Sequence, residues 1–256
     1  MEVSGDQAWA RTPPARVARE LILGGVFGAI VFAWSRRRVF GREHLAGLEG
    51  PVIFVANHSS HVDTPALLLS LPARWRRRTA VAAAADYFYG SRLLAAAVSL
   101  AFGTVPLDRR RQGTEVAHIR RLLDGGWSLV VFAEGTRSRD GRVGRMRSGA
   151  AVLAAEHGLP IVPVYISGTR DAMPIGSRWM VRPPGGGRLA RYPISVRFGA
   201  PIDAAAAGGR SEAMDRVRGF MQACGAETMP DRRPDPDPDA DADPPVRRPR
   251  DIAPAG

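Results

Sequence analysis

The most constraining feature of this sequence is a series of short, almost entirely apolar segments that alternate with stretches of helical character. The strand-like segments are residues 52–56, 79–83, 104–107, 128–133, 161–167 and 194–198. Strands that are apolar throughout, rather than at every second residue, are typical of sheets covered on both faces. The helix-like stretches are residues 65–71, 91–102, 115–123, 148–157 and 211–224. This alternation predicts an α/β fold with a mostly parallel central sheet flanked by helices.

Two residue types narrow the possible chemistry. The chain contains no lysine, so all 36 of its basic residues are arginine, and Cys224 is its only cysteine. The missing lysine excludes a P-loop lysine and a pyridoxal Schiff base. A single cysteine excludes a disulfide framework, a cysteine-rich zinc site and a redox pair of cysteines. We expect neither a metal nor a cofactor.

An apolar stretch at residues 21–34 precedes the predicted domain, and before it Pro13 and Pro14 suit the first turn of a helix. As a helix, residues 21–34 would extend about 21 Å, which is less than the roughly 30 Å of a bilayer core. An arginine run at residues 36–38 follows the stretch and would bind anionic headgroups. We predict a helix that lies on, or dips into, one leaflet. A buried core helix and a signal peptide are the alternatives.

Charge is distributed unevenly along the chain. Residues 228–256 hold seven aspartates and five arginines, so residues 1–227 carry a formal net charge of +13, compared with +11 for the whole chain. A body this basic favours polyanionic partners. The Asp-Pro composition of the tail predicts disorder, because the tail has little apolar surface to bury. We therefore divide the chain into an N-terminal segment (1–35), a central domain (36–227) and a disordered tail (228–256).

Two titratable side chains follow the first predicted strand. His58 and Asp63 come directly after residues 52–56, and a buried strand that ends in such residues is a normal place for α/β chemistry. Thr64 and Pro65 suit a helix start with Thr64 as the N-cap, which leaves the preceding chain free to curl. The Asp63 carboxylate could then orient the His58 imidazole as a general base. His61 is a competing candidate, and a purely structural histidine explains these residues equally well.

Residues suited to binding an anion follow two other predicted strands. Arg109 comes just after residues 104–107, and Gly135, Thr136 and Arg137 come just after residues 128–133. Gly135 lets the backbone approach a ligand closely, while Thr136 and backbone N–H groups can donate to phosphate oxygens. An arginine guanidinium can bind two phosphate oxygens at once. The alternative for each turn, taken by itself, is a surface turn that carries an arginine.

Together these segments resemble the glycerolipid acyltransferase family. Asn57, His58 and Asp63 match its HxxxxD motif, and residues 103–109 resemble its second block. Residues 134–138 match its EGTRS block, and residues 159–164 resemble its fourth, proline-containing block. The four blocks occur in family order, and the chain looks most like a 1-acylglycerol-3-phosphate acyltransferase. Pro106 replaces a common aromatic residue of the second block, and Ala133 replaces a common proline of the third.

The resemblance implies a role for each matching residue. His58 would act as the general base toward the acceptor hydroxyl, and Asp63 would orient its imidazole. The substrate-binding residues would be Arg109, Glu134, Gly135, Thr136 and Arg137, which would hold the glycerol phosphate head. The hydroxyl oxygen would attack the thioester of acyl-CoA or acyl-carrier protein directly, without a covalent acyl-enzyme.

The resemblance also implies partners and a location. The partners would be an acyl thioester, a lysophospholipid acceptor and an anionic membrane surface, at the cytoplasmic face of the cell membrane. Another lyso-lipid acceptor, such as lyso-ornithine lipid, would use the same motifs. A basic nucleic-acid-binding protein and a catalytically silent membrane scaffold are alternatives of other classes. Only 7% of the residues are aromatic and no nucleic-acid-binding motif is present, so no nucleic-acid partner is expected.

Overall fold

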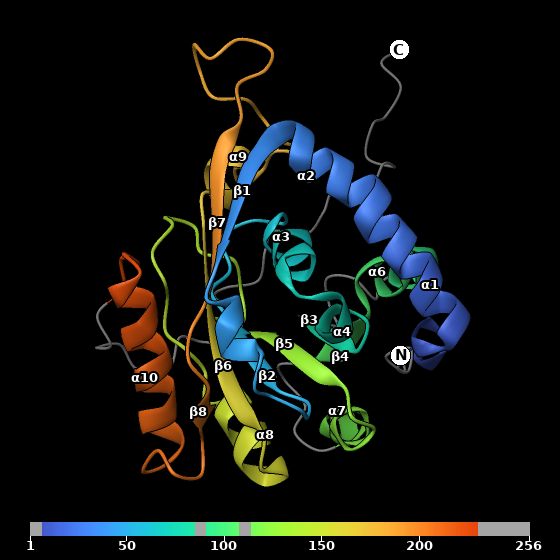
Figure 1. Cartoon of the computed structure of the whole chain (residues 1–256), viewed down its shortest axis with the longest axis vertical. Coiled ribbons are helices and arrows are strands. Elements are labelled where there is room, and N and C mark those ends of the chain that lie inside the picture. The colour runs from blue at the N-terminus through green and yellow to red at the C-terminus, as the bar shows by residue number, and fades with distance from the viewer. Residues whose placement is uncertain (1–6, 85–90, 108–113, 230–256) are drawn as a thin grey trace, which may run out of the picture.

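A twisted β-sheet forms the centre of the molecule (Figure 1). In the computed structural model, which describes residues 7–84, 91–107 and 114–229, the described strands form one eight-stranded sheet of order β1-β7-β6-β2-β5-β3-β4, with β8 paired to β6. The strands are β1 (Ser35–Phe40), β2 (Ile53–Ala56), β3 (Thr79–Ala84), β4 (Thr104–Leu107), β5 (Ser128–Phe132), β6 (Pro160–Ser167), β7 (Tyr192–Phe198) and β8 (Ile202–Asp203). Each of the six predicted strands is present, with ends that agree within two residues.

The sheet is mostly parallel and buried on both faces, as the sequence predicts. Strands β6, β2, β5, β3 and β4 run in the same direction, whereas β7 is antiparallel to β6. Successive residues of β2 pack into opposite cores: Phe54 and Ala56 into one, and Ile53 and Val55 into the other. All four residues are fully buried. A covering layer on each face explains why this strand is apolar throughout.

Helices form the two covering layers (Figure 1). One layer contains α1 (Pro13–Leu21), α2 (Gly28–Trp34), α3 (Asp63–Ser70), α4 (Ala73–Arg76) and α6 (Arg92–Phe102). The other contains α7 (Thr114–Asp124), α8 (Gly149–His157) and α10 (Arg210–Ala223). Short helical turns are η1 (Ala8–Arg11), η3 (Arg42–Leu45) and α9 (Thr169–Ala172). This arrangement confirms the predicted α/β class.

The arginine run at residues 36–38 lies within the sheet, which the sequence did not predict. These residues belong to β1, an edge strand, which pairs in parallel with β7. Burial along β1 alternates, so one face of the strand is exposed, and among the described strands only β7 pairs with it. Charged side chains are tolerated at such an edge and discourage pairing with other chains. Three consecutive arginines carry no apolar signal, and the strand was therefore missed.

The N-terminal helix is longer than residues 21–34. It continues from Pro13 to Trp34 through a π-helical segment, η2 (Ile22–Phe27), and is long and apolar enough to cross a membrane by length and composition. One side of it packs on the domain. Arg19, which is 2% exposed, donates hydrogen bonds to the carbonyls of Leu100, Ser99 and Ala10. Arg19 therefore attaches the helix to α6.

The outer side of this helix exposes large apolar side chains. Val17, Leu21 and Phe32 are 63%, 70% and 70% exposed. One side of this helix packs on the domain, and the other side exposes apolar side chains. Such an arrangement is typical of a helix that lies on a membrane surface. The predicted disordered tail lies outside the described residues from residue 230 onward.

Candidate functional site

The candidate site lies at one edge of the sheet, where three adjacent parallel strands end. Strand β2 lies between β5 and β6 and runs parallel to both. The residues that follow these strands are Asn57 and His58, Ala133 and Glu134, and Gly168 and Thr169. Because carboxyl ends of parallel strands meet at one edge, segments more than 100 residues apart in the sequence come together there.

Asn57 fixes the start of the first loop. Its side-chain amide donates to the carbonyl of Ile166 at 2.9 Å, and its side-chain oxygen accepts from the N–H of Ile166 at 2.8 Å. The buried amide thus continues the hydrogen bonding between β2 and β6 for one more residue. The next residue, His58, therefore leaves the sheet at a defined point.

The structure brings His58 and Asp63 together. Nδ1 of His58 lies 2.9 Å from Oδ2 of Asp63, and the two side chains are 19% and 0% exposed. Helix α3 begins at Asp63 itself, with Val62 as the N-cap, so the sequence-based assignment of Thr64 as the N-cap was wrong. The earlier start places the carboxylate in the first helical turn, where N–H groups are unpaired and an anion is stabilised.

Asp63 is held by donors on several sides. Oδ2 accepts from the backbone N–H groups of Ser59 at 2.6 Å and Ser60 at 2.8 Å, and Oδ1 accepts from the hydroxyl of Thr169. An ionised carboxylate can only accept, so the tautomer of His58 that fits this contact carries its proton on Nδ1. In that tautomer Nε2 is the unprotonated ring nitrogen.

Thr169 is a site residue that the sequence analysis did not identify. It is fully buried at the start of α9, and its hydroxyl also lies 3.2 Å from the Ser59 hydroxyl. Gly168 precedes it with φ +80°, and an added Cβ there would collide with the carbonyl oxygen of Pro193. The Gly-Thr pair directly after an apolar strand was the available signal, but its partner Asp63 is 106 residues away.

Replacing Thr169 with Val should destabilise the fold. Thr169→Val keeps the shape and removes the donor to a buried carboxylate, so we expect the free energy of unfolding to fall by about 1.5–3 kcal/mol. Thr169→Ser is the control, because it keeps the hydroxyl and loses one methyl group, which costs about 1 kcal/mol. Urea unfolding measures both variants. A Val variant as stable as the wild type would show that this hydrogen bond contributes nothing.

The loop after β5 holds the backbone of His58, and the last residue of β5 contacts its ring. The backbone N–H of His58 donates to Oε1 of Glu134 at 2.8 Å, and the carbonyl of His58 accepts from the N–H of Ser138 at 2.7 Å. The imidazole also stacks on the ring of Phe132, with centroids 4.1 Å apart and planes inclined by 21°. With Asp63 at Nδ1, these contacts leave the ring a single orientation.

Glu134 serves as a bridge between two backbone segments. Oε1 accepts from His58, and Oε2 accepts from the N–H of Gly144 at 2.8 Å. Burial raises the pKa of the Glu134 carboxyl to about 7, although both backbone hydrogen bonds act to lower it. Both carboxyl oxygens are thus engaged by the protein's own backbone.

The raised pKa of Glu134 predicts a pH-dependent stability. The folded state keeps this proton to a pH of about 7, compared with 4.5 for the free carboxyl, so its contribution is full below pH 4.5 and is lost as the pH rises to about 7. Across that window, wild-type stability should fall relative to Glu134→Gln by up to about 3 kcal/mol. Urea unfolding of both proteins at several pH values measures the difference. A difference independent of pH would contradict the prediction.

The remaining candidate residues lie on or near the same loop. Gly135 has φ +75°, and an added Cβ would stand 3.2 Å from Nε of Arg147. Thr136 and Arg137 are half-buried and lie between Glu134 and Ser138, the two residues bonded to the His58 backbone. Arg109 lies outside the described residues. Within residues 7–84, 91–107 and 114–229, no group of three or more His, Cys, Asp or Glu side chains could hold a metal ion.

The fold and site define the class of the protein as an α/β protein with a buried carboxylate that orients a partly exposed histidine at the carboxyl edge of a parallel sheet. The family model described as Acyltransferase matches residues 36–167, about half of the chain. The chain belongs to this family, as its sequence motifs predict.

Curated relatives of similar sequence carry one activity in their names. The chain is 32% identical over 151 residues to the chloroplastic 1-acyl-sn-glycerol-3-phosphate acyltransferase BAT2 of Brassica napus, covering 57% of this chain and 42% of that protein. It is 30% identical to 1-acyl-sn-glycerol-3-phosphate acyltransferase alpha of Homo sapiens, covering 53% and 47%. The chain thus spans about two-fifths of the length of the first of these relatives.

A solved structure shares the fold. The crystal structure of PlsC from Thermotoga maritima, a 1-acyl-sn-glycerophosphate (LPA) acyltransferase, superposes with a TM-score of 0.60 and 24% sequence identity. The match covers 86% of this chain and 82% of that one. It supports the α/β architecture across nearly the whole described chain.

Proposed function

We propose that the protein transfers a fatty acyl group from acyl-CoA or acyl-carrier protein to the free hydroxyl of 1-acylglycerol-3-phosphate, which yields phosphatidic acid. The observation that carries this proposal is the hydrogen bond of 2.9 Å between His58 and the fully buried Asp63. The family membership and the names of the relatives support the choice of reaction and acceptor.

His58 acts as the general base in this proposal. Because Asp63 accepts from Nδ1, the lone pair of Nε2 is available for the proton of the acceptor hydroxyl. The hydroxyl oxygen forms a bond to the thioester carbonyl carbon, the C–S bond breaks, and the proton passes from His58 to the departing thiolate. The carboxylate of Asp63 stabilises the imidazolium that forms between these two proton transfers.

The phosphate of the acceptor is bound by the loop that holds His58. Arg137 supplies a guanidinium, and Thr136 and the backbone at Gly135 supply further donors, a set of groups suited to phosphate. Arg109 is proposed as a second guanidinium on the basis of the family motif. The Glu134 carboxylate, with both oxygens bonded to backbone N–H groups, positions this loop against His58.

Removal of the Arg137 guanidinium should weaken acceptor binding. Arg137→Ala loses charge-assisted hydrogen bonds of about 1.5–3 kcal/mol, so KM for the lysophospholipid should rise about 10–150-fold while kcat changes much less. Steady-state kinetics with the acceptor varied measures the effect, and KM for acyl-CoA is the internal control. An unchanged acceptor KM would remove Arg137 from the phosphate site.

The acceptor lipid resides in a membrane, and we propose that the protein works at the cytoplasmic face of the cell membrane. The exposed apolar side of Pro13–Trp34 supports this location, as does the net charge of +11 on the chain. Basic residues near an anionic leaflet contribute about 1 kcal/mol each to binding.

A thiol-release assay tests the proposed reaction. Purified protein is mixed with acyl-CoA and a panel of lyso-lipids that includes 1-acylglycerol-3-phosphate and lyso-ornithine lipid, and products are identified by mass spectrometry. The proposal predicts CoA release that depends on 1-acylglycerol-3-phosphate. Acylation of only another lyso-lipid would replace the acceptor, and no acyl transfer from either acyl-CoA or acyl-carrier protein would overturn the proposal.

A further inference from the structure

The segment between α9 and β7, residues 174–191, has an unusual composition for an exposed connection. It contains four arginines and no acidic residue. It also exposes four large apolar side chains, of which Leu189 is the most exposed at 83%; the others are Ile175, Trp179 and Val181. Exposed apolar and aromatic side chains mixed with arginine alone suit an anionic membrane interface, because the apolar groups enter the acyl region and the guanidiniums bind headgroups.

This segment is attached to the end of the N-terminal helix, and Figure 1 shows the two lying next to one another. Nη1 of Arg182 donates to the carbonyl of Ala33 at 3.2 Å, and its guanidinium lies 4.4 Å from the ring centroid of Trp34. Nη1 of Arg191 donates to the carbonyl of Phe32 at 3.1 Å. The two arginines thus pair with the last carbonyls of α2, which have no partner within the helix.

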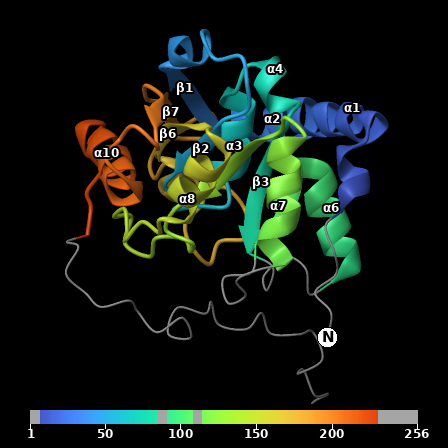
Figure 2. The same ribbon diagram turned by 90° about the horizontal axis from the view of Figure 1, so that it is seen from below.

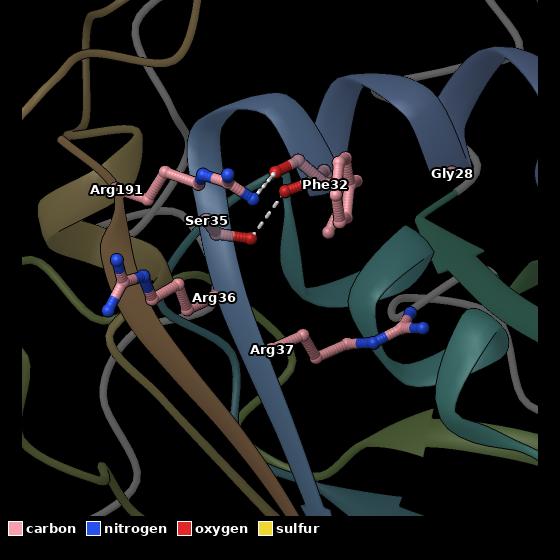
Figure 3. A pocket seen from close by; sticks show the side chains of 7 residues that line it. Gly28, Phe32, Ser35, Arg36, Arg37 and Arg191 are labelled. Atoms are coloured by element: carbon pink, nitrogen blue, oxygen red, sulfur yellow. Dashed lines mark hydrogen bonds between the residues drawn. The ribbon is translucent and has the colours of Figure 1, made fainter. Parts of the chain in front are cut away.

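A basic hollow lies at the junction between residues 174–191 and the end of α2. A cavity of about 240 Å³ lies between α2 and β1, lined by apolar residues of α2 and by Ser35, Arg36, Arg37 and Arg191. In Figure 3, Arg191 reaches the carbonyl of Phe32, whereas the side chains of Arg36 and Arg37 point in opposite directions from β1. Because these guanidiniums diverge, we assign the hollow no ligand of its own. It extends the positive charge of residues 174–191 onto the start of β1, next to the helix.

The junction also lies at the same edge of the sheet as His58. Strand β7 begins at Tyr192, directly after residues 174–191, and pairs antiparallel with β6 so that Ser195 faces Ser167. The amino end of β7 therefore meets the carboxyl end of β6, from which Thr169 follows. Membrane contact at this junction would turn the His58 edge toward the lipid surface.

We propose that residues 174–191 are a second membrane-contacting element, which inserts Leu189 and Trp179 into the same anionic leaflet as Pro13–Trp34. This inference rests on the proposed membrane association of the helix. The two elements form one surface, with apolar side chains from both and arginines at their junction. The occupant is a leaflet that contains anionic lipid.

Site-specific labelling tests this inference. In a Cys224→Ser background, single cysteines at Leu189→Cys, Leu21→Cys and Asp215→Cys carry an environment-sensitive fluorophore. Asp215 is exposed on α10, which Figures 1 and 2 place on the opposite side of the molecule from α1. The probes are vesicles of phosphatidylcholine alone and vesicles with about one-third phosphatidylglycerol. We expect blue shifts at positions 189 and 21 with anionic vesicles, and none at position 215.

The outcomes separate the two proposals. A shift at position 21 without one at position 189 overturns the second element and leaves the helix as a membrane contact. No shift at either position overturns the membrane association itself. In addition, Leu189→Asp should lower the vesicle partition coefficient about tenfold or more, because a buried leucine contributes at least that much. Ala206→Asp, the same added charge at an exposed site before α10, should leave it unchanged. Equal partitioning of both variants would also overturn the inference.

Discussion

Replacing His58 with alanine is expected to lower kcat for acyl transfer by about 10²–10⁴-fold, which is the usual contribution of a general base. The loss arises because the acceptor hydroxyl is a poor nucleophile until its proton is removed. In this structure the only proposed acceptor for that proton is Nε2 of His58. Binding of either substrate should change much less, so the effect belongs to kcat and not to KM.

The substitution should remove the imidazole and leave the position of the loop unchanged. Glu134 and Ser138 bond the backbone N–H and carbonyl of residue 58, so alanine keeps both contacts and the loop stays anchored. Circular dichroism and urea unfolding check that the variant is folded, and single-turnover CoA release measures the chemical step. His61→Ala is the matched control and should keep activity. Near-normal rates for His58→Ala, with loss of activity in His61→Ala, would assign the base to His61.

Strands could be predicted from the sequence where both of their faces are buried, because such strands contain few polar residues. Strand β2 is the clearest example, since all four of its residues are fully buried. Edge strands lose this signal, and β1, with three arginines and alternating burial, was missed for that reason. The two prolines indicated a helix start at Pro13, but the apolar pattern indicated only residues 21–34 of the helix Pro13–Trp34, because Arg16, Arg19 and Glu20 interrupt that pattern.

Part of the candidate site could also be predicted from the sequence, and part could not. The HxxxxD spacing indicated the pair of His58 and Asp63, because both lie in one short segment. Two of the bonds that hold this pair come from Glu134 and Thr169, which are 76 and 106 residues away from their partners. Spacing along the chain carries no information about such contacts. They follow only from the strand order that places β5 and β6 on either side of β2.

Replacing Asp63 with asparagine is expected to lower kcat by about 10–10³-fold with little loss of structure. The amide oxygen can take the place of Oδ2 and accept from Ser59, Ser60 and His58, while the amide nitrogen donates to Thr169, whose hydroxyl can also accept. What the variant loses is the negative charge beside the imidazolium that forms during the reaction. An opposite charge at this distance favours a protonated group by about 10–10³.

The comparison with Thr169→Val distinguishes this electrostatic role from a merely structural one. Thr169→Val removes a hydrogen bond from Asp63 but leaves the charge of the carboxylate in place, so its kcat should fall far less than that of Asp63→Asn. Single-turnover CoA release measures the chemical step in both variants, and urea unfolding measures their stability. If the two variants lose kcat to the same extent, Asp63 acts by holding the loop and its charge does not stabilise the protonated base.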